Sequence, residues 1–172
     1  AQLGYPMVLK MPESSFSKGV FKVSCRDELM AKGVELLAVS ALVLAQEYMF
    51  TEFDWRIGVL NGRAIYACRY YMAKNHWQIY NHQSKRFFSG GFDSLPTFEV
   101  PTPILSAAIK SAAAIGNGFY GIDLKQNGKQ AYVLEVNDNP NIDYGVEDAY
   151  LGEELYMQIM SEFLRRLEGR GL

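Results

Sequence analysis

Short stretches of alternating or continuous hydrophobic residues divide the first half of the chain into candidate strands. Met7–Lys10 and Val20–Val23 lie on either side of a Ser-rich loop, and we expect them to form a hairpin. Trp55–Leu60 and Ala64–Tyr71 meet at Asn61-Gly62, a dipeptide typical of two-residue hairpin turns. The pattern therefore predicts two antiparallel pairs before residue 72.

The rest of the pattern predicts further strands and three helices. Strands are expected at 42–49, 77–80, 120–124 and 131–137, the last two as a second hairpin. Helices are expected at 26–39, 103–115 and 153–167. Ser24 with Asp27 resembles a capping box, Thr102 precedes Pro103 as a cap, and Gly116 can end the second helix. The mixture predicts an α+β fold of two lobes, residues 1–47 and 48–172.

The composition narrows the classes of partner. With 172 residues, of which 49% are hydrophobic, the chain can bury a core without disulfides. Its 17 basic and 19 acidic residues give a formal net charge of -2, so no overall field favours a nucleic acid or an anionic membrane. We therefore expect neither as a partner, while oligomerisation stays open.

Cysteine usage and the chain's apolar runs bear on its compartment. Cys25 and Cys68 lie in unrelated contexts, which favours a reducing cytoplasm over a disulfide framework. The longest apolar run, Leu36–Ala45, is shorter than the roughly 20 residues of a membrane span, and we expect no signal peptide before it. The chain begins at Ala1, almost directly before a strand pattern, so we expect a piece of a longer protein.

Two carboxylates and an amide interrupt the apolar residues of the second hairpin. Asp123 lies in its first strand, while Glu135 and Asn137 share one face of its second strand because side chains alternate. Charges within apolar runs are costly unless they are paired or bind a cation, and this oxygen set suits Mg²⁺. The alternative is an edge hairpin that faces solvent. The polar residues at 138–141, which continue after the strand, favour the cation.

The register of this hairpin decides whether a cation site can form. A two-residue turn at Asn127-Gly128 would pair residue 126 with residue 129 and place Asp123 on the face opposite Glu135. A loop of odd length, or a β-bulge, would bring Asp123 to the face of Glu135. The metal hypothesis therefore requires a departure from the simplest turn.

Five short motifs follow one another between residues 9 and 140. They are Leu9-Lys10, Gln46-Glu47-Tyr48-Met49, Asp54-Trp55-Arg56, Gly121-Ile122-Asp123-Leu124 and Glu135-Val136-Asn137-Asp138-Asn139-Pro140. In this order they resemble the ATP-grasp enzymes, and among them the RimK-type carboxylate-amine ligases. The resemblance implies an ATP-grasp fold with ATP between two α+β lobes. It also implies a family domain before the first motif, to which only about six residues correspond here.

The resemblance assigns nucleotide binding to residues near the start of the chain. Lys10 matches a lysine that contacts phosphates, and Glu47 and Tyr48 match the strand whose backbone binds adenine. Ser15 and Lys18 fall in a loop that would cover the phosphates, although it has one glycine where many relatives have several. The alternative for Lys10 is an ordinary surface lysine, and the alternative for Glu47 and Tyr48 is a buried strand with one exposed acid.

The same resemblance assigns the chemistry to the second lobe. Asp54 and Arg56 match a motif whose acid serves nucleotide binding and whose arginine faces the reacting phosphate. Arg69 matches a second catalytic arginine, with a surface ion pair as the alternative. The family's metal ligands are matched by Asp123, Glu135 and Asn137, and two further nucleotide-site positions by Lys74 and Asn139.

The activity implied by the resemblance is an ATP-dependent ligation without a covalent enzyme nucleophile. A carboxylate of a peptide, protein or small molecule would attack ATP to give an acyl phosphate. An amine, with glutamate favoured, would then form the amide. Mg²⁺ or Mn²⁺, together with Lys10, Arg56 and Arg69, would offset charge on the transferring phosphate. The alternatives are a regulatory module that binds nucleotide without turnover and a purely structural domain.

Overall fold

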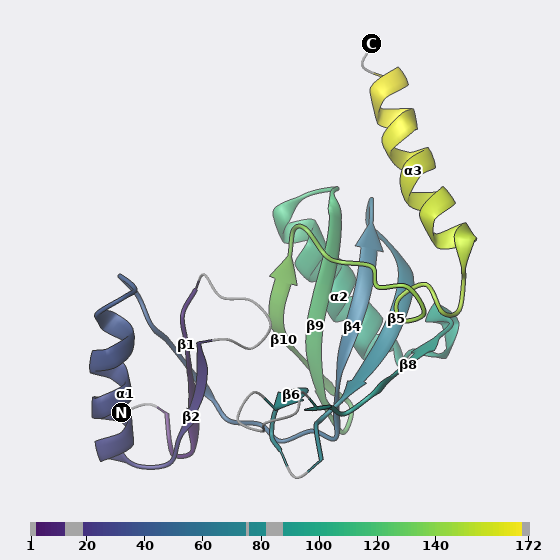
Figure 1. Cartoon of the computed structure of the whole chain (residues 1–172). Coiled ribbons are helices and arrows are strands. Elements are labelled where there is room, and N and C mark those ends of the chain that lie inside the picture. Colours follow the sequence, from purple (N-terminus) through teal and green to yellow (C-terminus); the bar gives the residue numbers. More distant parts are fainter. Residues whose placement is uncertain (1–2, 13–18, 75, 82–87, 170–172) are drawn as a thin grey trace. The chain divides into compact units, whose positions relative to one another are not determined.

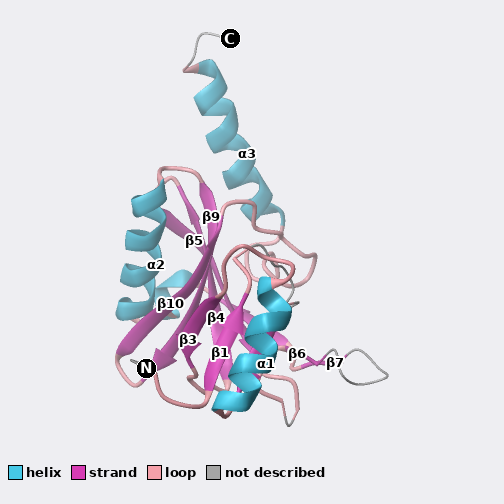
Figure 2. Ribbon diagram, turned by 90° about the vertical axis from the view of Figure 1, so that its left-hand side faces the viewer, coloured by secondary structure: helices cyan, strands magenta, loops and turns pink. Residues whose placement is uncertain are grey.

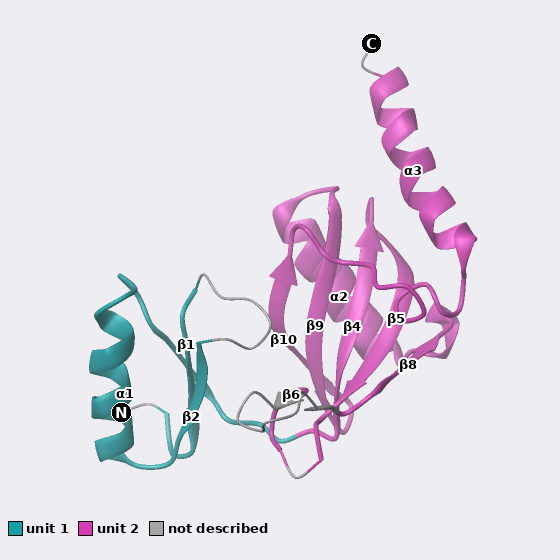
Figure 3. Cartoon of the chain, in the orientation of Figure 1, with its two compact units in different colours: residues 1–50 teal, residues 51–172 magenta. Residues whose placement is uncertain are grey.

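The computed structural model describes residues 3–12, 19–74, 76–81 and 88–169 (Figure 1). The chain divides into two compact units, residues 1–50 and 51–172 (Figure 3). The sequence pattern placed a boundary three residues earlier, at 47/48. Each unit combines an antiparallel sheet with at least one helix, as an α+β fold requires.

The first unit is a three-stranded sheet with one helix. Its strand order is β2-β1-β3, and the elements are β1 (Met7–Lys10), β2 (Val20–Val23), β3 (Leu44–Glu47) and α1 (Arg26–Leu37). Both neighbours pair antiparallel to the central strand β1. Because side chains alternate along a strand, one face of the sheet supplies a core that α1 completes. That core contains Met7, Leu9, Val23 and Leu36.

The start of α1 differs from the predicted capping box. Cys25 is the N-cap residue and makes no side-chain capping bond. Instead the Glu28 carboxylate accepts the backbone N–H of Ser24 at 2.7 Å. The pairing of Ser24 with Asp27 was therefore wrong, because the acid that reaches back lies one residue later and has the longer side chain.

The second unit contains a five-stranded antiparallel sheet in the order β10-β9-β4-β5-β8. Its strands are β4 (Phe53–Leu60), β5 (Arg63–Tyr71), β8 (Phe92–Leu95), β9 (Phe119–Asn127) and β10 (Gln130–Asn137). Helix α2 (Thr102–Ile115) lies along one face of this sheet (Figure 2). The core between them includes Ile57, Ile122, Leu124, Ile104 and Ala108. The opposite face is therefore the one that can present polar groups.

Turns and shorter elements complete the second unit. The predicted Asn61-Gly62 turn is confirmed, with positive φ angles of 48° and 74° at its two residues. The predicted strand at 77–80 was wrong, since only Tyr80 enters a strand there. The remaining elements are β6 (Tyr80–Asn81), β7 (Phe88–Ser89), the 3-10 helix η1 (Thr97–Glu99) and α3 (Glu153–Glu168).

The ends of α2 test two further expectations. Thr102 is the first helical residue rather than the cap, because Pro101 takes the N-cap position and no side-chain capping bond forms. Gly116 ends the helix as predicted, with φ 156°. Within the described ranges, no helix combines the length and hydrophobicity that a membrane span requires.

Candidate functional site

One row of side chains crosses the whole five-stranded sheet on the face opposite α2. Cross-strand pairs link Ser94 to Cys68, Cys68 to Arg56 and Arg56 to Asp123. Asp123 in turn pairs with Glu135. Residues directly opposite one another in a sheet share a face. We call these five residues the polar row.

A β-bulge in the second hairpin brings Asp123 and Glu135 together. Strands β9 and β10 are joined by a two-residue turn, Gly128-Lys129, and their register runs regularly as far as the Val133–Leu124 pair. The next pair is Glu135 with Asp123, so Leu134 is the extra, bulged residue. Without the bulge, Asp123 would oppose Leu134. The structure thus meets the register condition that the metal hypothesis set.

Arg56 and Asp123 form a two-point ion pair within this row. Arg56 Nε donates to Asp123 Oδ1 and Nη2 donates to Oδ2, each at 2.8 Å. Both side chains are 21% exposed. Burial alone would lower the pKa of Arg56, but the hydrogen bonds and charge of Asp123, with Tyr70 and Tyr66, raise it. The guanidinium is therefore a permanent positive charge beside the acids.

The hairpin face offers three oxygen-bearing side chains to a cation. Asn137 Nδ2 lies 3.2 Å from the backbone oxygen of Gly121 and 3.4 Å from Asp123 Oδ2. Glu135 lies directly opposite Asp123 and is exposed. No three His, Cys, Asp or Glu side chains gather in the described part of the chain. The set reaches three donors through the Asn137 amide, and two carboxylates with one amide suit Mg²⁺.

A second ion pair lies on the same face, two residues along each strand. Lys125 Nζ lies 2.6 Å from Asp54 Oδ1 and donates to Thr51 Oγ1 at 2.7 Å, while Thr51 also donates to Asp54. Burial raises the pKa of Asp54, and the charge and hydrogen bond of Lys125 offset this in part. Strands β4 and β9 thus each present one acid and one base, with opposite signs facing each other.

The loop at 138–152 covers the β5 end of the sheet face that carries the polar row. Asn141 Oδ1 accepts from Arg56 Nη1 at 3.3 Å. The carboxylate of Glu147, 1% exposed, accepts the Tyr70 hydroxyl and, at 2.8 Å, the backbone N–H of Asp143. The Tyr70 ring centroid lies 5.4 Å from the Arg56 guanidinium carbon. The Arg56 guanidinium is therefore contacted by Asn141 of the loop and by the ring of Tyr70 of β5.

Two residues of β5 fill the space beneath this loop. A side chain at Gly58 would come within 2.1 Å of the Tyr66 ring, so glycine is required there. The Tyr66 hydroxyl is the one buried side-chain polar atom, among those described, without a hydrogen-bond partner. Burial raises the pKa of the Cys68 thiol to about 12, so the thiol stays protonated at neutral pH.

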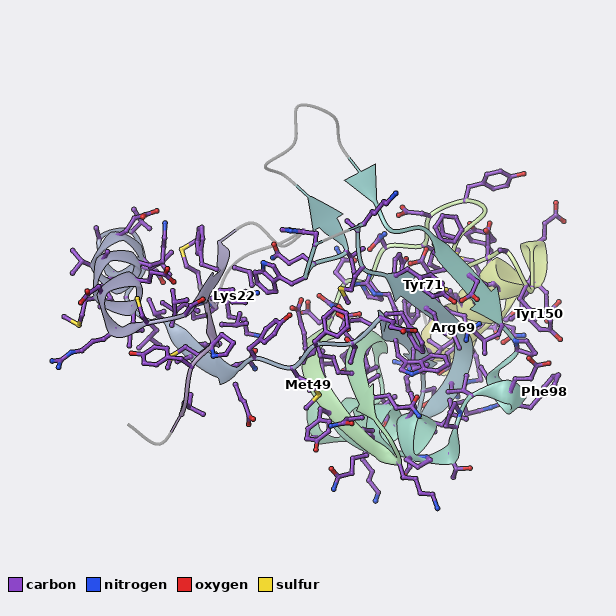
Figure 4. All side chains as sticks on the ribbon, turned by 90° about the horizontal axis from the view of Figure 1, so that it is seen from below. Lys22, Met49, Arg69, Tyr71, Phe98 and Tyr150 are labelled. Atoms are coloured by element: carbon purple, nitrogen blue, oxygen red, sulfur yellow. The ribbon has the colours of Figure 1, made fainter. Side chains whose placement is uncertain are left out.

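Arg69 does not join Arg56. Its cross-strand partners are Trp55 and Asp93, so it lies on the face that α2 covers. Its Nε and Nη2 donate to Asp93 at 2.9 and 2.5 Å, and the rings of Phe53, Trp55 and Tyr71 surround it at 5.3 to 6.0 Å. Figure 4 shows Arg69 and Tyr71 close together. The structure therefore does not bring Arg69 together with Arg56, because neighbouring residues of a strand take opposite faces and Arg69 follows Cys68, which shares the face of Arg56.

The expected nucleotide residues of the first unit lie on both faces of its sheet. Glu47 pairs with Met7 and so shares the face of the core, whereas Lys10 lies on the opposite face. Lys22 shares the face of Lys10 and stacks at 4.6 Å on the ring of Tyr48. Lys22 was not expected from sequence, although its alternation with the buried Val23 indicates its face.

The remaining residues expected at the nucleotide site either lie outside the described residues or are exposed in loops. Ser15 and Lys18 lie outside the described residues. Lys74 is exposed in the turn after β5, and Asn139 is exposed in the loop after β10. Asn141, two residues later, is the asparagine that contacts Arg56. The polar run after β10 indicated such a residue but did not distinguish between the two.

Comparisons with known proteins identify the family and the fold of the chain. The model of the RimK-like ATP-grasp domain matches residues 1–162. The chain is 27% identical to a probable alpha-L-glutamate ligase of Maridesulfovibrio salexigens, covering 84% of this chain and 46% of that protein. It is 26% identical to a D-alanine–D-alanine ligase of Desulforudis audaxviator, covering 83% and 48%. The chain thus spans about half the length of these curated relatives.

A solved structure shares the fold. The D-alanine–D-alanine ligase from Bacillus anthracis, in a crystal structure complexed with ATP, superimposes with a TM-score of 0.70 at 18% identity. The superposition covers 97% of this chain and 56% of that one. At this identity the likeness establishes the ATP-grasp fold, as the order of the motifs predicted.

Proposed function

The chain belongs to the RimK-like ATP-grasp family, and on that premise we propose that it forms the nucleotide- and cation-binding part of an ATP-dependent carboxylate-amine ligase. The observation that carries the proposal is the pairing of Asp123 with Glu135 across the bulged hairpin, next to Arg56. Two acids and a guanidinium on one face are what a cation and a phosphate need together.

The residues divide into cation ligands and phosphate ligands. Asp123, Glu135 and Asn137 would hold Mg²⁺ or Mn²⁺, which when bound offsets the negative charge of phosphate oxygens. Arg56 would contact the transferring phosphate, since its fork matches phosphate geometry. Lys10, Glu47, Tyr48 and Asp54 keep the nucleotide roles that the family resemblance gives them.

The proposed reaction joins a carboxylate to an amine through an acyl phosphate, with ADP and phosphate as the other products. Glutamate is the favoured amine, since one relative is named a probable alpha-L-glutamate ligase, while another joins two D-alanines. Both would form an amide to an amino acid. The free thiols of Cys25 and Cys68 agree with a reducing cytoplasm as the compartment.

Turnover separates this proposal from a regulatory module. The protein that contains this chain is mixed with Mg²⁺, ATP, glutamate and a panel of peptide carboxylates, and ADP release is measured. We expect ADP only when both a carboxylate and an amine are present. Tight nucleotide binding without ADP release under any combination would favour the regulatory module.

A further inference from the structure

Arg56 binds the carboxylate of Asp123, which a cation would need as a ligand. Its Nε and Nη2 contact both oxygens of Asp123 at 2.8 Å, the two-point arrangement in which a guanidinium binds a carboxylate strongly. Asn137 Nδ2 lies 3.4 Å from one of the same oxygens. A cation that approaches Asp123 therefore meets a donor on each oxygen and a positive charge beside it.

Arg56 is held in a way that permits exchange of its anionic partner. Nη1 contacts Asn141 on the loop, and the Tyr70 ring lies beneath the guanidinium. Neither contact involves Asp123. Because these two neutral contacts use neither Nε nor Nη2, the edge of the guanidinium that binds Asp123 can bind a different oxyanion while both contacts remain.

We propose that Arg56 excludes divalent cations from Asp123 until a phosphate of the nucleotide takes over its guanidinium. This inference rests on the proposed function. The phosphate would free Asp123 for the cation, and the cation would free Arg56 for the phosphate, so each favours the binding of the other. The site would then admit the cation and the nucleotide together and reject the cation alone.

The other ion pairs of the sheet are not expected to behave in this way. Lys125 and Asp54 are next to each other on the same face, but Thr51 also binds both of them. Arg69 makes the same two-point contact with Asp93, yet it lies on the face of α2 within a group of aromatic rings. Arg69 is therefore the matched control for Arg56.

The test measures binding of Mn²⁺ alone, by the loss of the free-ion electron paramagnetic resonance signal. Removing one positive charge from the site should tighten Mn²⁺ binding in Arg56→Gln by about tenfold or more. Arg69→Gln should bind Mn²⁺ as the unsubstituted chain does. Adding Asp123→Asn to Arg56→Gln should abolish the gain. Equal Mn²⁺ affinity in Arg56→Gln and the unsubstituted chain would overturn the inference.

Two further measurements keep the outcomes separate. Arg56→Lys retains the charge with one contact, so it should show a smaller gain in the same direction, and a loss would overturn the inference should Arg56→Gln fail to fold. Binding of Mn²⁺ with ADP to the unsubstituted chain tests the proposed function by itself. If the unsubstituted chain binds Mn-ADP, the proposed function is supported. If Arg56→Gln nevertheless gains no affinity for Mn²⁺ alone, the exclusion of cations by Arg56 is wrong.

Discussion

Two arginine–aspartate pairs on opposite faces of one sheet use the same two-point contact in different surroundings. Arg56 and Asp123 are each 21% exposed and lie beside Glu135, Asn137 and Asn141. The side chains of Arg69 and Asp93 are 33% and 40% exposed, and three aromatic rings surround the guanidinium. The first pair has polar neighbours that offer other partners, whereas the second has neighbours that fix it.

This difference shows that an ion pair becomes a candidate site through what lies around it. The attraction between the Arg69 guanidinium and the three aromatic rings is lost if the guanidinium moves away from them. The acids and amides around Arg56 can exchange it for a cation, because they remain satisfied afterwards. We therefore propose that the face of Arg56 carries the chemistry and that the face of Arg69 contributes to stability.

The largest expected difference between the two arginines is in turnover after each guanidinium is removed. Arg56→Gln should lower the ATP turnover of the protein that contains this chain by about 100-fold or more, because one charge donor to the transition state is lost. Arg69→Gln should leave turnover close to that of the unsubstituted protein. Similar losses in both variants would contradict the division between the two faces.

A milder change separates two roles for Arg56. Arg56→Lys replaces a two-point contact with a one-point contact, so turnover should fall by about tenfold while nucleotide affinity stays within about tenfold. Steady-state kinetics and calorimetry provide the two numbers. A loss of affinity as large as the loss of turnover would show that the two-point contact of Arg56 is as strong in the bound nucleotide as in the transition state.

Stability should respond on the other face. Arg69→Gln removes an ion pair and the ring contacts, and we expect the free energy of unfolding to fall by about 1–2 kcal/mol. Urea denaturation measures this, with Arg63→Gln in the exposed hairpin as a control that should change by less than about 0.5 kcal/mol. A control that loses as much as Arg69→Gln would show that the aromatic rings add nothing.

The smallest expected effect is on cysteine alkylation, which reports how well the loop at 138–152 covers the sheet face that carries the polar row. Cys68 is buried beneath it with its pKa raised to about 12, whereas Cys25 is exposed. Iodoacetamide at pH 8 should therefore alkylate Cys25 and spare Cys68 in the folded chain. Peptide mass spectrometry identifies the modified residue. Rapid alkylation of Cys68 would show that the loop opens readily.

The sequence predicted most elements and the composition of the acidic hairpin, because both follow from local alternation. It also showed that the site needed a register shift, but it could not locate the bulge at Leu134. Arg69 was grouped with Arg56 because a motif match does not record which face a residue takes. Tyr70, Glu147 and Lys125 were missed, since their contacts join segments 71 to 77 residues apart.

We propose that Asp123, Glu135 and Asn137 together bind the cation that supports nucleotide binding. Calorimetric titration of ADP with and without Mg²⁺ into the unsubstituted chain and Glu135→Gln tests it most directly, because the substitution keeps the shape and removes one charge. We expect the Mg²⁺-dependent part of the affinity to weaken in Glu135→Gln, because one of the two carboxylates that would hold the cation is lost. An unchanged Mg²⁺ dependence in a folded Glu135→Gln chain would contradict the account.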